Sequence, residues 1–387
     1  MTAHVLKLIV KNALRHKLRT ALTAAGIVVA ILSFGLLQTV IGAWYAGANA
    51  ASDARLVTRN AISLAFPMPL SYASRIRAVD GVAAVTHANW FGGVYQDPKN
   101  FFAQFAVDAR TYLDLFPEFR LSEAERTAFL RDRKGAIVGR KLANQYGFKV
   151  GDSIPLRGTI FPGQWEFVVR GIYDGGKPTT DTSQMLFQWD YLNESMLKTF
   201  PRRANQVGFY VVRIENPDDA AAVSRAIDEQ FKNSIAETVT ETEKAFQLGF
   251  VSMSEAIVVA IRVVSFVVIV IILAVMANTM AMSARERLAE YATLKALGFG
   301  PGFLATLILG ESVAICAAGA AAGIALTFPV AAAFSAKMGT LFPVFHVELA
   351  TLVMQAAAAL VVGLAAAVVP SLRSARISIV NGLRHAG

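Results

Sequence analysis

Four long apolar runs constrain what this chain can fold into. They cover residues 21–43, 263–282, 303–330 and 349–369, and Glu311 is the one charged residue inside them. A helix needs about 20 apolar residues to cross the hydrocarbon core of a bilayer. The sequence therefore predicts an α-helical integral membrane protein with four transmembrane helices.

The composition agrees with a membrane protein and argues against a nucleic-acid-binding protein. Of the 387 residues, 55% are hydrophobic and 17% are charged, and the formal net charge is +9. The cations flank the apolar runs, whereas a nucleic-acid-binding protein would carry them on a polar folded surface. We therefore expect membrane lipids, and no nucleic acid, among the partners. The single cysteine, Cys316, excludes an intrachain disulfide.

Cations beside the runs predict the orientation, because Lys and Arg near the end of a span resist translocation. They precede the first run, lie between the second and third, and follow the fourth: Lys7, Lys11, Arg15, Lys17, Arg19, Arg285, Arg287, Lys295, Arg373, Arg376 and Arg384. The short segment between the third and fourth runs has only Lys337. We expect both termini in the cytoplasm and the long segment after the first run outside it.

The predicted layout alternates spans with polar segments. It comprises a cytoplasmic or interfacial amphipathic helix (1–20), the first span (21–43), an extracytoplasmic domain (44–255), the second span (256–283), a cytoplasmic loop (284–302), the third span (303–331), a short outer loop (332–348), the fourth span (349–369) and a cytoplasmic tail (370–387). The segment after the first span is too long for a loop without its own fold. It is predicted to be a domain.

Residues 1–20 permit more than one interpretation. As a helix they would separate cations from apolar side chains, as in a helix that lies in the membrane interface. The two stripes are Lys7, Lys11 and Arg15, and Leu6, Ile9, Val10 and Ala13. A solvated cationic leader is the alternative. Together with Ala48-Asn49-Ala50 the segment also resembles a secretory signal, although the apolar run is longer than in a typical signal.

The outer domain mixes the periodicities of strands and helices, which predicts a mixed α/β fold. A strand is expected to start at Gly81, and others to cover 135–139, 150–156, 165–172 and 209–214. Helices are expected over 140–146, with a stop at Gly147, and over about 218–231.

Residues 171–177 match most of a phosphate-binding loop, but Pro178 stands where a Ser or Thr should bind Mg²⁺. We interpret this segment as a turn. No catalytic or metal-binding spacing occurs among the histidines. We therefore expect no cofactor in this chain and do not expect an enzyme.

The segment between the second and third spans resembles a known family. From Met282 to Pro301 it runs MSARERLAEYATLKALGFGP. It is similar to the corresponding segment of the MacB/FtsX-like ABC permease family, which has an Arg- and Glu-rich stretch, then a glutamate, then a Leu-basic-Ala-Leu-Gly end. The matching residues are Arg285, Glu286, Arg287, Glu290 and 294–298. Further similarity lies at 12–20, 26–27, 79–85, 135–156 and 370–376, whereas 97–133 has no motif that matches.

The same segment is predicted to form a coupling helix that contacts an ATPase. The predicted site residues are Arg285, Glu286, Arg287, Glu290, Tyr291, Leu294, Lys295, Leu297 and Gly298. Leu288, Tyr291, Leu294 and Leu297 recur at threefold spacing and could bury an apolar stripe in a partner's groove. Gly298 is expected to end the helix, and Pro301 to prevent its continuation into the third span. A plain interhelical loop is the alternative.

Glu311 is predicted to lie inside the membrane, where a carboxylate must face protein or be protonated. Asn278 or Thr279 is expected at the same depth and could donate a hydrogen bond that ties the second and third spans together. A role in substrate or proton transfer is the alternative. Gly319 and Gly323 form a small-residue notch that predicts close helix packing, within one chain or between two.

The resemblance implies the permease subunit of an ABC transporter in a bacterial inner membrane, with a periplasmic core domain. The implied partners are a cytoplasmic ATPase dimer, which would bind the ATP and Mg²⁺, and a second permease chain in a homodimer or heterodimer. A periplasmic adaptor protein is a further candidate. The implied activity is mechanotransmission for the export or extraction of a lipid, lipoprotein, peptide or hydrophobic compound. The alternatives are a non-transporting signal transducer that regulates cell-envelope enzymes and a receptor-like protein without an ATPase.

Overall fold

The computed structural model describes residues 8–9, 11–13, 15–338, 342 and 344–376. The chain forms two compact units. The helical unit comprises residues up to 42, 255–337 and 345 onward, and the sheet unit comprises 43–254 and 338–344. The predicted fold class is confirmed: four helices long and apolar enough to cross a membrane accompany a mixed α/β domain inserted between the first and second of them.

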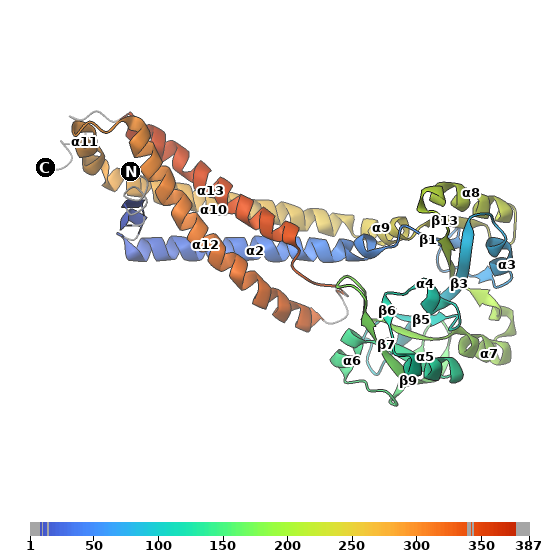
Figure 1. Cartoon of the computed structure of the whole chain (residues 1–387). Coiled ribbons are helices and arrows are strands. Elements are labelled where there is room, and N and C mark those ends of the chain that lie inside the picture. Colours follow the sequence, from blue (N-terminus) through green and yellow to red (C-terminus); the bar gives the residue numbers. More distant parts are fainter. Residues whose placement is uncertain (1–7, 10, 14, 339–341, 343, 377–387) are drawn as a thin grey trace. The chain divides into compact units, whose positions relative to one another are not determined.

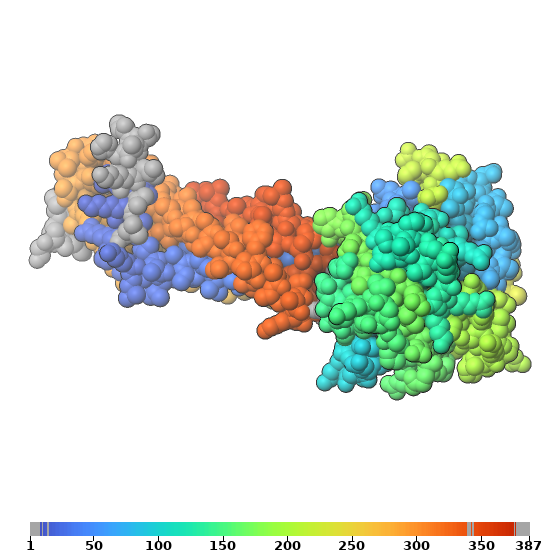
Figure 2. Space-filling model, turned by 60° about the horizontal axis from the view of Figure 1, so that its bottom comes forward, coloured from blue at the N-terminus to red at the C-terminus, as the bar shows by residue number. Residues whose placement is uncertain are grey.

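The four long helices contain the predicted spans and extend beyond them. They are α2 (Lys17–Ala50), α10 (Glu255–Glu286), α12 (Pro301–Met338) and α13 (Leu349–Ala375). A short helix, α11 (Leu288–Ala296), lies between α10 and α12. In the space-filling view α12 and α13 lie side by side, and the Ser312 hydroxyl donates to the Gly363 carbonyl over 2.6 Å (Figures 1 and 2).

Glycines let α12 approach α2 closely. A Cβ atom added to Gly319 would lie 2.8 Å from Cβ of Ile27, and one added to Gly323 would lie 3.0 Å from Cβ of Ile31. The notch predicted from these two glycines therefore serves a contact within the chain. A polar side chain of α13 joins both of these helices, because Gln355 donates to the Ile31 carbonyl of α2 at 2.8 Å and to the Thr327 hydroxyl of α12 at 3.0 Å.

Before α2, Ile9 and Ala13 are buried and Lys11 is exposed. Cδ1 of Ile9 lies 2.5 Å from the position of a Cβ on Gly310, so this segment packs against α12. The remaining apolar members of the predicted stripe, Leu6 and Val10, and the cation Lys7 lie outside the described residues.

The sheet unit is built around one long sheet with helices packed against it. Its strands are β1 (Arg55–Asn60), β2 (Met68–Pro69), β3 (Val82–Trp90), β4 (Gly93–Val94), β5 (Gln104–Val107), β6 (Phe119–Arg120), β7 (Gly135–Gly139), β8 (Ser153–Gly158), β9 (Gly163–Gly175), β10 (Met185–Gln188), β11 (Gln206–Val207), β12 (Phe209–Ile214) and β13 (Thr238–Thr242). Its helices are α3 (Tyr72–Arg77), α4 (Tyr112–Leu115), α5 (Glu123–Arg131), α6 (Arg140–Tyr146), α7 (Trp189–Thr199), α8 (Ala220–Phe231) and α9 (Glu243–Met253).

The strand order is β13-β1-β12-β3-β5-β10-β7-β9-β8-β4, with β6 paired to β9 and a separate β2–β11 pair. We call β13, β1, β12 and β3 the first half of the sheet and the strands from β5 to β4 the second half (Figure 1). The halves meet where β3 pairs with β5 at Ala88, Asn89 and Trp90. Side chains alternate between two buried faces, as in β12, where Tyr210 and Val212 lie in one apolar cluster and Val211 in the other.

Several predicted elements agree with the structure. The strand at 135–139, the helix at 140–146 and the strand at 209–214 have the predicted bounds. Gly147 ends α6 with a φ of 73°, which favours glycine.

The predicted turn at 171–177 is wrong, because β9 continues through Gly175. Gly171 is needed for packing instead: an added Cβ would lie 2.8 Å from Leu121 and 2.9 Å from Glu125. The segment 97–133, which matched no motif, folds into β5, α4, β6 and α5.

The notch predicts that Gly319→Ala is destabilising. The new Cβ would press on Ile27, and overpacking of this kind costs about 1–3 kcal/mol. The control is Gly302→Ala in the first turn of α12, where an added Cβ meets nothing within 4 Å. Thermal unfolding in detergent should show a lower midpoint for Gly319→Ala alone; equal midpoints for the two variants would contradict the packing described.

Candidate functional site

The candidate site is the segment from Arg285 to Phe299, which contains α11. The helix ends in a motif that satisfies its last carbonyls: Gly298 N donates to the Lys295 carbonyl at 3.0 Å, and Phe299 N donates to the Leu294 carbonyl at 3.1 Å. Gly298 has a φ of 92°, and Pro301 then begins α12. The predicted roles of Gly298 and Pro301 are therefore confirmed.

Arg287, between α10 and α11, is buried and holds two carboxylates. Its Nη1 donates to Glu311 at 2.8 Å, and its Nε donates to Glu290 at 3.0 Å. The side chains of Arg287 and Glu311 are only 8% and 7% exposed. The guanidinium also lies 5.3 Å from the ring centre of Tyr291. Ser283 completes the surroundings of Glu311 with a hydrogen bond of 3.3 Å.

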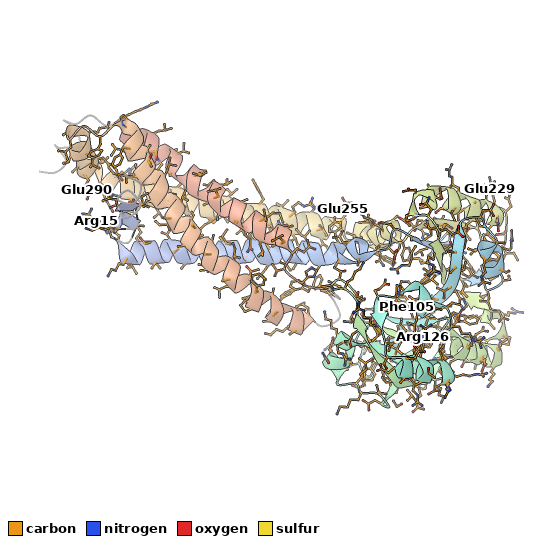
Figure 3. All side chains as sticks on the ribbon, viewed as in Figure 1. Arg15, Phe105, Arg126, Glu229, Glu255 and Glu290 are labelled. Atoms are coloured by element: carbon orange, nitrogen blue, oxygen red, sulfur yellow. The ribbon has the colours of Figure 1, made fainter. Side chains whose placement is uncertain are left out.

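Two arginines near the N-terminus extend this arrangement. Arg15 donates to Glu290, and the two side chains lie together in Figure 3. Arg19 binds both oxygens of Glu286 at 2.7 Å, in the fork geometry that only arginine offers. We call Arg15, Arg19, Glu286, Arg287, Glu290 and Glu311 the ion network.

Burial and the ion network act together on the pKa values of two residues on α11. Burial acts to raise the pKa of Glu290, but hydrogen bonds from Arg15 and Arg287 outweigh it and lower that pKa. Burial raises the pKa of Tyr291 to about 12, although the charge of Arg287 acts in the opposite direction. At neutral pH, Glu290 is therefore an anion and Tyr291 a neutral phenol.

The predicted partners of Glu311 are wrong. Among the described residues, Ser283 and Arg287 bond to Glu311, whereas the Thr279 hydroxyl donates to the Val275 carbonyl at 2.9 Å and Asn278 contributes no bond to the carboxylate. The prediction assumed that equal distances from the helix ends give equal depth. Because α12 crosses α10 at an angle (Figure 1), Glu311 meets α10 at Ser283, nearer the C-terminal end of α10 than Asn278 or Thr279.

The predicted apolar stripe is largely unavailable to a partner. Tyr291 is 1% exposed and belongs to the core of the helical unit, against which Leu294 is also packed. Leu297, in contrast, is 71% exposed, and Phe299 is 42% exposed. Arg285 and Gly298 are also exposed, and Lys295 is half-buried.

We call Ala296, Leu297, Gly298 and Phe299 the exposed tip; all four are exposed. Phe299 was not among the predicted site residues. The signal available for it was an aromatic residue placed directly after the helix-ending glycine.

Among the residues that the structure describes, no group of three or more His, Cys, Asp or Glu side chains is arranged to hold a metal ion.

The buried pair predicts a strongly non-additive pair of substitutions. Arg287→Met should leave Glu311 buried without its cation, which costs about 3–5 kcal/mol. The double variant Arg287→Met, Glu311→Leu should be more stable than Arg287→Met alone, because both charges are gone. Unfolding of the variants in one detergent tests this. Additive losses would show that Arg287 and Glu311 do not depend on one another.

Comparisons with known proteins agree with this architecture. A family model described as the MacB-like periplasmic core domain matches residues 20–230, and one described as the FtsX-like permease C-terminal matches residues 262–379. No curated protein matches the sequence.

Two solved structures are similar to part of the chain. One is the extracellular domain of the noncanonic ABC-type transporter YknZ from Gram-positive bacteria, with 13% identity and a TM-score of 0.35, covering 49% of this chain and 100% of that one. The other is a domain of a putative permease protein from Porphyromonas gingivalis, with 16% identity and a TM-score of 0.34, covering 49% of this chain and 90% of that one.

The core-domain match spans more than half of the chain, and the permease match covers the helices that follow it. The order of parts is that of the fold: a first membrane helix, a large α/β domain, and three further membrane helices. This chain belongs to the MacB/FtsX-like family of ABC transporter permeases.

Proposed function

We propose that this chain, as the permease subunit of an ABC transporter, receives the motion of a separate cytoplasmic ATPase at the exposed tip of α11. The observation that carries the proposal is the contrast along one short helix. Tyr291, in the middle of α11, is buried in the chain's own core. Leu297 and Phe299, which follow the end of the helix at Ala296, are exposed. An exposed apolar pair on a rigid, well-anchored helix end is suited to insertion into a partner's groove.

The proposed orientation follows from the cations. Arg15, Arg19, Arg285, Arg287 and Lys295 belong to the segment around α11 and the N-terminus, and this distribution favours a cytoplasmic location for both. The sheet unit is then periplasmic. An ATPase in the cytoplasm would bind the ATP and Mg²⁺ and meet α11.

The ion network supports a rigid transfer of motion from α11. Arg287 follows the last residue of α10 and holds Glu311 of α12, and Glu290 of α11 holds Arg15. A displacement of the tip is therefore resisted by paired charges on three segments. We assign Glu311 a structural role in this transfer, as the buried anion that fixes Arg287.

We propose mechanotransmission, with the periplasmic unit acting on a substrate outside the cytoplasm. Glu311, the one charged residue in the four apolar runs, is paired with Arg287, and the pocket that it lines has a volume of about 20 Å³, room for one water. The substrate classes that fit are a lipid, lipoprotein, peptide or hydrophobic compound. ABC ATPases work as dimers, so we propose a second permease chain in the complex.

Co-purification of the tagged chain in detergent tests the contact. We expect an ATPase of the ABC class to accompany the wild type and to be lost from Leu297→Asp, because the charge would have to be buried in the partner's groove. The matched control is Val150→Asp, an exposed apolar residue of the sheet unit that is 54% exposed.

The control variant should retain the ATPase. If Leu297→Asp binds the ATPase as well as Val150→Asp does, the tip is not the contact. If the wild type brings no ATPase, the proposed function itself fails.

A further inference from the structure

Arg55 is a buried arginine in the sheet unit with no part in the site described above. It is 5% exposed. Its Nε donates to Glu243 at 2.7 Å, its Nη2 donates to Glu118 at 2.5 Å, and its Nη1 donates to the Leu115 carbonyl at 2.9 Å. The guanidinium also stacks over Phe116, 4.3 Å from the ring centre.

The groups that Arg55 holds come from two places in the chain, both far from Arg55 in the sequence. Arg55 begins β1, shortly after the end of α2 at Ala50. Glu243 is the first residue of α9, the helix that precedes α10, and it also accepts from Ser52 N at 2.8 Å. Glu118 follows α4, in the stretch that leads to β6, and β6 pairs with β9 of the second half of the sheet. One side chain thus ties the ends of two membrane-linked helices to the second half.

The chain path gives the second half few covalent connections to the rest of the sheet unit. Residues 91–205, which contain all its strands, lie between β3 and β12, so both of its chain connections lead to the first half. The sheet itself is continuous there through a short pairing of β3 with β5. Movement of α2 and α9 can reach the second half through these connections, through the apolar clusters that the two halves share, and through polar contacts such as those of Arg55.

The chemistry of the contact suits a fixed joint. The planar guanidinium can serve two carboxylates and a carbonyl at fixed angles, which a lysine cannot do. Removing one partner from a buried group of charges is strongly unfavourable, whereas the intact group adds little net stability over apolar residues of the same size. Such a group specifies one arrangement more than it stabilises the fold.

We propose that Arg55 is a positioning residue that locks the two halves of the sheet at the ends of α2 and α9, so that the sheet unit moves as one body when the membrane helices move. This inference rests on the proposed function for its purpose, but the lock itself does not require an ATPase.

Spin labels on the full chain can test the lock. Cys316 is the single cysteine and is buried, so labels are placed in a Cys316→Ala background at Ala124→Cys in α5 and Ala226→Cys in α8, both exposed positions. Pulsed electron paramagnetic resonance then reports the distance between the two halves. We expect a single narrow distribution, with and without ATP and the co-purified ATPase.

Arg55→Met should abolish the single narrow peak. The matched control is Arg59→Met, which breaks the Arg59–Glu241 pair of 3.0 Å on β1 and β13 and thus stays within the first half; it should leave the peak unchanged. Should Arg55→Met fail to fold, Glu118→Ala decides the matter, because it removes the charged partner in the stretch that leads to β6 and leaves Arg55 paired with Glu243. It should broaden the distribution in the same way.

The outcomes separate the two proposals. A narrow peak in both Arg55→Met and Glu118→Ala would overturn the lock, whatever ATPase is bound. An ATP-dependent change of the distance in the wild type would overturn the single-body motion. Absence of any co-purified ATPase would contradict the proposed function. The spin-label distances measured without nucleotide would then still test whether Arg55 locks the two halves together.

Discussion

The buried pair of Arg287 and Glu311 is the contact on which the segment between α10 and α12 depends. Neither charge could be buried alone, because the transfer of an unpaired ion from water costs several kcal/mol. Together they fix the point where α10 ends, α11 begins and α12 passes. Tyr291 packs beside the pair, and this orientation leaves Leu297 and Phe299 facing outward. The exposed tip is therefore a consequence of what is buried behind it.

A second buried arginine has the corresponding place in the sheet unit. Arg55 joins the start of β1 to the start of α9 and to the second half of the sheet. In both units a buried arginine satisfies two carboxylates, at least one of them from a distant segment, at the point where a membrane helix meets another element. Fixed joints of this kind agree with a protein that transmits displacement. They would serve less purpose in one that opens a polar path through the membrane.

The sequence predicted those parts of the fold that local patterns determine. The apolar runs identified the four long helices, and Gly135–Gly139 with the stop at Gly147 located β7 and α6. The capping box of Ser122 and Glu125 is a sequence signal for the start of α5. It lies in the segment that matched no motif, and no helix was predicted there. The partner of Glu311 could not be predicted, because it depends on the angle between α10 and α12. The apolar pattern of either helix alone does not determine that angle. For the same reason the threefold spacing of Tyr291 and its neighbours did not reveal which face is buried.

Site-specific photocrosslinking in cells tests the central claim most directly. A photoreactive phenylalanine analogue at Phe299, which is 42% exposed, should form a covalent adduct with an ABC-class ATPase. The same analogue at Val150 in the sheet unit should form no such adduct. An adduct of the ATPase at Val150, or none at Phe299 while the ATPase still co-purifies with the chain, would contradict the assignment of the exposed tip as the site where the chain receives its motion.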